Sequence, residues 1–316
     1  GLFDRVHEKF YGSAVSATFE IEPAAMPATE PGDVLAWAEA YPLASEANGV
    51  WDNGGADTLL TTAANWEEDA LPELTDGTAV LTFASAGTKA PVAGPTTVRG
   101  LKFNAKNNFT LDAQGADSAL SIGVGGITLE NDPAETISGD WRLHTFACPV
   151  ALTTDQTWDL SPNGKRRIQL TGEDCLRGAS NTTVTVTGNG CLGFVATNSF
   201  KGDFRLEGGI YKVLSKCRPF GAADEGGKVY LDMQHVSIFD VFGAVIDKPL
   251  VITGGNTTSE AFMTHEQYGT NVFAAPVTLN NADLMMSVSG PTVFAGGCTF
   301  NSKVTFTGTH GMPLIF

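Results

Sequence analysis

The chain has 316 residues, of which 36 are glycine, and only 17% carry a charged side chain. A formal net charge of −16 and an isoelectric point near 4.6 would repel a nucleic-acid backbone or an anionic membrane surface, so neither is expected as a partner. No apolar run reaches the ~20 residues that a transmembrane helix needs, so no membrane span is expected.

Residues 1–48 are predicted to form an N-terminal segment and a proline-rich linker. Three prolines in the stretch 23–31 disfavour regular strand pairing and favour an extended chain. The chain starts at Gly1 without a basic and apolar leader, and it stops within a strand-like pattern that has no polar cap. We therefore expect it to be a piece of a longer protein.

Residues 49–134 are predicted to form a tryptophan-containing β-cap and the first coils of a repeat. Trp51 and Trp66 bracket a loop rich in glycine, aspartate and asparagine, and an alternating strand follows at 78–83. Buried indoles that anchor the loop are the favoured interpretation, and an exposed platform for stacking sugars is the alternative. Further short strands are expected at 97–103 and 108–112.

Residues 135–316 are predicted to form β-solenoid repeats, and the stretch 187–231 shows the pattern best. It contains TGNGCLGF, then NSFKG, FRLEGGIYKV, RPFG and GGKVYL, in which short apolar strands end at glycine or asparagine. The same pattern recurs in part at 291–308. One such coil cannot bury its apolar face alone, so neighbouring coils must stack on it.

This pattern resembles the autotransporter-associated β-strand repeat of bacterial surface proteins, and residues 50–83 resemble the opening module of the same proteins. In that repeat a G-x-G-x-L strand, an N-x-[FY]-x-G turn and an L-x-x-G-x-[LIY] strand form successive sides of one coil. Cys191 departs from it where threonine or serine is usual. The resemblance implies an all-β fold, a right-handed parallel β-helix, with about eight coils of 20–25 residues from 135 onward.

The same resemblance implies a non-catalytic adhesin or scaffold that is secreted or lies on the bacterial cell surface. Its expected partners are surface glycans or other copies of itself. Two other classes stay open: a polysaccharide-active enzyme or carbohydrate-binding module, and a self-assembling fibre, sheath or viral fibre subunit.

One cluster of charged residues is a candidate for chemistry on polysaccharides, because paired carboxylates hydrolyse glycosides and a basic residue would suit a uronic acid. It comprises Asp155, Asp159, Glu173 and Asp174 with Lys165, Arg166 and Arg167. A solvated turn is the favoured interpretation. The acidic run 67–69 lacks the surrounding pattern of a calcium loop. No catalytic, cofactor-binding or metal-binding residue is therefore assigned, and no cofactor is expected.

The five cysteines are Cys148, Cys175, Cys191, Cys217 and Cys298. They have no C-x-x-C spacing, and their odd number excludes a complete disulfide framework, although one or two bridges stay possible. Small apolar side chains that face the core are the favoured interpretation.

Overall fold

The computed structural model describes residues 48–84, 88–104, 108–115, 117–130, 142–160, 166–172, 174–214, 217–222, 226–258, 261–280, 282–308 and 312–316. The described residues all belong to one compact unit of the chain, 47–316. Of the predicted N-terminal segment and linker, residues 1–47 lie outside the described part. The described part contains no helix with the length and hydropathy of a membrane span.

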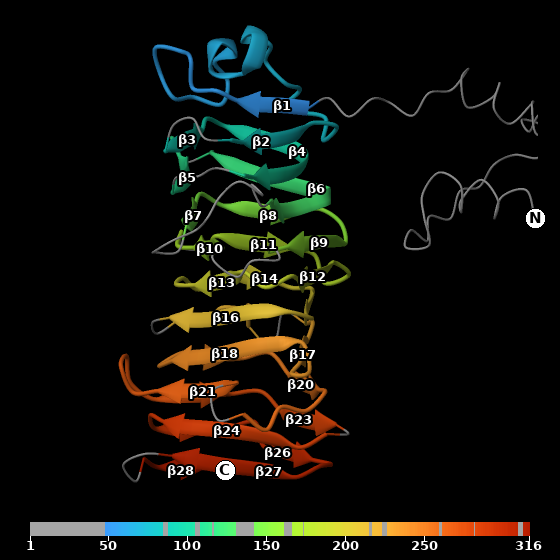
Figure 1. Ribbon diagram of the computed structural model, residues 1–316, viewed down its shortest axis with the longest axis vertical. Helices are drawn as coiled ribbons and strands as arrows, with labels where there is room; N and C mark the ends of the chain where they lie inside the picture. Colours follow the sequence, from blue (N-terminus) through green and yellow to red (C-terminus); the bar gives the residue numbers. More distant parts are fainter. Residues whose placement is uncertain are drawn as a thin grey trace, which may run out of the picture. The chain divides into compact units, whose positions relative to one another are not determined.

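Residues 48–316 form a parallel β-solenoid in which successive coils stack along one axis (Figure 1). Every pair of named strands is parallel, which confirms the predicted all-β solenoid. Sheet A has fourteen strands: β1 Asn48–Trp51, β2 Val80–Phe83, β4 Pro95–Phe103, β6 Ala119–Leu129, β8 Val150–Leu152, β9 Gln156–Asp159, β11 Leu176–Gly178, β12 Thr183–Thr187, β14 Ser199–Phe200, β15 Asp203–Leu206, β17 Val229–Asp232, β20 Leu250–Thr253, β23 Val277–Asn280 and β26 Cys298–Phe300.

Two further sheets complete the coils. Sheet B has ten strands: β3 Lys89–Val92, β5 Phe109–Ala113, β7 Arg142–Ala147, β10 Arg166–Leu170, β13 Cys191–Phe194, β16 Gly209–Leu214, β18 Val236–Phe242, β21 Phe262–His265, β24 Leu284–Ser289 and β27 Val304–Gly308. Sheet C has four: β19 Val245–Ile246, β22 Asn271–Phe273, β25 Thr292–Val293 and β28 Leu314–Ile315. The eight sheet-B strands from β7 to β27 agree with the expected number of coils after residue 135.

Coil length varies more than the sequence pattern predicts. Register partners in sheet A are 20 residues apart between Val80 and Gly100, and 32 apart between Asn48 and Val80. The strands keep their pairing because the extra residues are accommodated in the connections between them. The expected boundary at 134/135 falls between β6 and β7, and the sheets pair across it, since β5 bonds to β7.

The core is filled by alternate residues of each strand, as the period of two requires. In β12, Val184 and Val186 are fully buried, while the threonines on either side of them are partly exposed. Aromatic rings also stack from coil to coil, for example Phe83 on Phe103 with ring centroids 5.1 Å apart. Stacking thus removes from water the apolar face that no single coil can cover.

The stretch 198–202, which includes the two-residue strand β14, shows why the N-x-F-x-G pattern suits a coil corner. Asn198 is buried; its Oδ1 accepts the N–H of Leu176 at 2.9 Å, and its Nδ2 donates to the carbonyl of Pro219 at 2.7 Å. One side chain therefore links the preceding and following coils. A Cβ on Gly202 would lie 1.8 Å from the carbonyl oxygen of Thr182, so only glycine allows the coils to approach this closely.

The segment 52–79, with the short 3-10 helices η2 Ala63–Asn65 and η3 Glu67–Asp69, lies at the first-coil end of the solenoid (Figure 1). Its Leu60 N–H donates to the carbonyl of Pro91 on β3 at 3.4 Å. The segment therefore contacts the outer edge of sheet B. That it acts as a cap stays a prediction.

Candidate functional site

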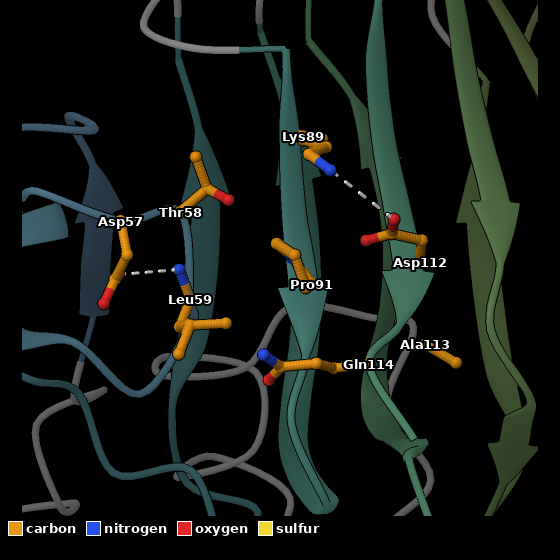
Figure 2. Close-up of a pocket in the computed structure, with 8 residues that line it drawn as sticks. All are labelled: Asp57, Thr58, Leu59, Lys89, Pro91, Asp112, Ala113 and Gln114. Carbon is orange, nitrogen blue, oxygen red and sulfur yellow. Dashed lines mark hydrogen bonds and ion pairs between the residues drawn. The ribbon is translucent and has the colours of Figure 1, made fainter. Parts of the chain in front are cut away.

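An open groove lies between the segment 52–79 and the first strands of sheet B (Figure 2). It has a volume of about 480 Å³. Its lining residues are Asp57, Thr58, Leu59, Lys89, Pro91, Asp112, Ala113 and Gln114. Three of them come from the segment, two from β3, and the rest from β5 and the residue after it, so the stacking of coils positions the whole groove.

Asp57 forms one side of this groove, and both of its carboxylate oxygens already accept hydrogen bonds from the protein. Oδ1 accepts the N–H of Leu59 at 3.0 Å and the Nδ2 of Asn65 at 3.1 Å, while Oδ2 accepts the hydroxyl of Thr62 at 3.0 Å. The N–H of Leu59 contributes most to lowering the pKa of Asp57, because these bonds favour the charged form. Asp57 therefore shapes the loop and stays ionised at neutral pH.

Lys89 and Asp112 form the other side and face each other across neighbouring strands (Figure 2). The Nζ of Lys89 lies 4.0 Å from Oδ2 of Asp112, and both side chains reach solvent. A long, exposed ion pair of this kind contributes little to stability, so its groups are available to a ligand.

The groove is lined by three apolar residues, Leu59, Pro91 and Ala113, and by five polar or charged ones. Hydrolysis by two carboxylates needs one carboxyl that is still protonated near neutral pH, and the pKa of Asp57 is shifted in the opposite direction. Asp57 therefore does not provide that protonated carboxyl.

The acidic residues that the sequence offered for catalysis have structural contacts. Oδ1 of Asp155, the residue before β9, accepts the N–H of Thr183, the first residue of β12 on the next coil, at 2.7 Å. Asp203 does the same two coils along, where its Oδ1 accepts the N–H of Lys228 at 2.7 Å. Because the same contact recurs at equivalent places, Asp155 is explained by coil stacking.

The other members of that cluster occupy separate elements. Asp159 ends β9 in sheet A, and Arg166 begins β10 in sheet B, where it is fully buried and Arg167 beside it is half-buried. Asp174 lies in the turn before β11, and its Oδ2 pairs with Nε of Arg177 at 2.7 Å. Glu173 and Lys165 lie outside the described residues. None of the described members lines the groove of Figure 2.

Both tryptophans are fully buried, as the anchoring interpretation predicts. Their rings meet edge to face with centroids 5.1 Å apart, and both contact Phe83 of the next coil. The Nε1 of Trp66 donates to the carbonyl of Leu60 at 2.8 Å, whereas Nε1 of Trp51 has no hydrogen-bond partner among the described residues. Buried rings cannot form a sugar-stacking platform.

The cysteines are free thiols; four are buried and Cys298 is half-buried. Burial raises the pKa of Cys148 and Cys175 to about 12, which keeps both protonated and unreactive. Within the described ranges no group of three or more histidine, cysteine, aspartate or glutamate side chains could hold a metal ion.

A polar cluster that the sequence did not indicate lies on the outer face of sheet B. Asp240 is 4% exposed, and its carboxylate is 3.5 Å from Nζ of Lys212 on one neighbouring strand and 3.5 Å from Nε2 of His265 on the other. The ring of His265 also stacks on Phe242 at 4.1 Å. Only the register brings these residues together, since they lie on three separate strands, β16, β18 and β21. Lys212 and His265 thus give the buried carboxylate of Asp240 polar partners, and the cluster links three coils.

Comparison of the chain with family models, with curated proteins and with solved structures finds no match.

Proposed function

We propose that this chain is a non-catalytic, secreted or cell-surface β-solenoid of bacterial origin that serves as an adhesin or scaffold. One observation carries the proposal: Asp155, one of the acidic candidates for catalysis, makes the same inter-coil hydrogen bond as Asp203. The similarity of 187–231 and 50–83 to autotransporter-associated repeats supports the location and the adhesive role. Surface glycans or other copies of the chain are the partners that such a role requires.

Turnover measurements on neutral and acidic polysaccharides test this proposal. The wild-type chain should release no product. Asp155→Ala and Asp203→Ala should each lower thermal stability, by about 1 kcal/mol, because each leaves one backbone N–H without its acceptor. Turnover that disappears in Asp155→Ala but persists in Asp203→Ala, with both variants folded, would establish an enzyme instead.

Carbohydrate binding without catalysis is a second candidate, and the groove of Figure 2 favours it. Its apolar side chains suit the C–H faces of a sugar ring, and its amide, ammonium and carboxylate groups suit the hydroxyl groups around the ring. Lys89→Ala and Gln114→Ala should then weaken binding on a glycan array by at least tenfold. Lys102→Ala is the matched control, because Lys102 forms a similar exposed pair with Glu130, at 3.6 Å, outside the groove. Equal binding by all three variants would exclude the groove.

A further inference from the structure

Two of the buried cysteines lie at the same corner of consecutive coils. Cys148 comes two residues before β8, and Cys175 comes directly before β11. The strands β8 and β11 lie side by side and pair in parallel with Val150 opposite Leu176 (Figure 1), so Cys148 and Cys175 are diagonal neighbours if this register continues. Neighbouring strands are about 4.8 Å apart and each residue rises about 3.3 Å, which places the two Cα atoms about 6 Å apart. Disulfides join Cα atoms that are about 4.4–6.8 Å apart.

The side chain of Cys175 reaches back to the coil that holds Cys148. Its Sγ lies 3.1 Å from the carbonyl oxygen of Cys148 and 3.4 Å from that of Phe146. Both cysteine side chains belong to the apolar core. Burial is the main cause that raises the pKa of Cys148, and the negative charge of a Cys175 thiolate raises it further, as expected for two groups that lie close together. The two sulfur atoms therefore share one part of the interior.

The other cysteines of the described chain are not placed in this way. Cys217 occupies the equivalent corner two coils after Cys175, since its Sγ faces the carbonyl of Phe194 as that of Cys175 faces the carbonyl of Phe146, two strands earlier in sheet B. Two strand spacings are about 10 Å, which is too far for a disulfide. The remaining two, Cys191 and Cys298, lie on β13 and β26.

We propose that Cys148 and Cys175 form a disulfide that joins two consecutive coils at this corner when the chain folds in the presence of a small-molecule disulfide such as oxidised glutathione. The thiolate of Cys148 attacks one sulfur of the oxidant, which releases one glutathione and leaves a mixed disulfide. The thiolate of Cys175 then attacks the sulfur of Cys148 and releases the second glutathione. Two cysteine thiols are oxidised, and the oxidant is reduced to two thiols that take up the two protons.

The bond has to form while the chain folds. In the folded chain both cysteines are fully buried and burial raises the pKa of each to about 12, so the thiols are protonated and no oxidant reaches them. The same burial shields the finished bond from reductants. A secreted location would supply the oxidising compartment. The bond itself depends only on the corner, so it can fail while the adhesin or scaffold role stands.

Refolding of the reduced, urea-unfolded 316-residue chain in a mixture of reduced and oxidised glutathione tests the bond. The remaining thiols are then alkylated in denaturant, and trypsin separates the two cysteines by cutting at Arg166 and Arg167. Mass spectrometry should find the peptides of Cys148 and Cys175 joined, with the loss of two hydrogen atoms. The other three cysteines should be fully alkylated.

Urea unfolding with and without a reductant shows whether the bond stabilises the coils. The oxidised wild type should unfold at a urea concentration higher by about 1 M than the reduced wild type, because the bond closes a loop in the unfolded chain. Cys148→Ala and Cys175→Ala, each compared with itself, should show no effect of the reductant. Cys217→Ala is the control, because it removes a buried thiol at the equivalent corner and should keep the full effect.

Three results would overturn the proposal. The first is five alkylated thiols in a refolded chain that circular dichroism shows to be folded. The second is a peptide map in which Cys217 is joined as often as Cys175. The third is an effect of the reductant that persists in Cys148→Ala. The peptide map of the wild type decides the question even if an alanine variant does not fold.

Discussion

Buried polar side chains show at the residue scale how tightly the coils are packed. His144 on β7 is fully buried, and its ring stacks on Phe103 with centroids 4.9 Å apart. Neither ring nitrogen has a hydrogen-bond partner among the described residues. Burial, with a smaller effect from the charge of Arg166, lowers the pKa of His144 to about 3. The sequence could not predict the burial of His144, because whether an isolated histidine faces the core or the solvent is known only once the strand register is known.

His144 should make the protein sensitive to acid. Its pKa is about 3 in the folded chain, against 6.5 for a histidine in water, so the unfolded chain binds more protons between these two values. The stability present above pH 6.5 is lost as pH falls toward 3, by about 3 kcal/mol at pH 4 relative to pH 8. Urea unfolding of wild type and His144→Phe at about pH 8, 6, 5 and 4 measures this difference. Identical pH dependence of the two proteins would show that His144 is not buried as a neutral ring.

The paired tryptophans differ in one hydrogen bond, and this gives a matched test. Truncating either ring in Trp51→Ala or Trp66→Ala should cost about 3–5 kcal/mol of unfolding free energy. Trp66→Phe should cost about 1–3 kcal/mol more than Trp51→Phe, since only Trp66 donates to the buried carbonyl of Leu60. Thermal and urea unfolding of the four variants checks both comparisons. Equal costs for the two Phe variants would contradict the assigned contact.

The sequence predicts the burial of both rings because aromatic residues beside a glycine-rich loop need a surface to pack on. It does not predict which indole is bonded, because the carbonyl of Leu60 is placed by the fold of the whole segment 52–79. The groove of Figure 2 escaped prediction for a related reason: its residues come from three stretches that only stacking brings together.

At the scale of elements, the longer strands and one coil corner were predictable: the strands expected at 97–103 and 108–112 correspond to β4 and β5. The N-x-F-x-G pattern indicated the corner at 198–202, and the structure places an inter-coil asparagine and a tightly packed glycine there. The third side of the coils was not identified as separate strands, because elements such as β19 and β25 are two residues long and have no periodicity to detect.

Asn198 should be among the most sensitive positions at these corners. Asn198→Ala leaves the N–H of Leu176 and the carbonyl of Pro219 unbonded in the interior, at a cost of about 2–4 kcal/mol. The control is Asn301→Ala, since the Nδ2 of Asn301 donates to Oδ1 of Asn280 at 2.9 Å on the exposed surface. That change should cost less than about 1 kcal/mol. Similar losses in urea unfolding would mean that Asn198 does not link the coils.

At the scale of the whole described unit, stability comes from repetition. Each inner coil buries its apolar face against its two neighbours, so the parallel order of the strands and the positions of the outward-facing side chains both follow from one register. The sequence predicted this architecture because glycine-punctuated short strands recur without helical spacing. It could not predict the variable coil lengths, because residues added at a corner leave the strand pattern unchanged.

Distances along the outer face of sheet A test this register directly. Thr157, Thr185 and Thr278 lie in one column with Thr299, since each is linked to the next through consecutive register pairs. Thr185 and Thr278 are four strands apart, and Thr157 and Thr299 are six, so their Cα atoms should be separated by about 19 Å and about 29 Å.

The measurement is double electron–electron resonance on two spin-labelled variants, Thr185→Cys with Thr278→Cys and Thr157→Cys with Thr299→Cys. Both variants also carry Cys298→Ser. They are diluted with unlabelled chain so that only distances within one copy contribute. The stacked solenoid predicts two single, narrow distances that increase in proportion to the number of strands between the labels. Distances that do not increase from the first pair to the second, as two antiparallel sheets packed face to face would give, would contradict the solenoid and every contact between coils that depends on it.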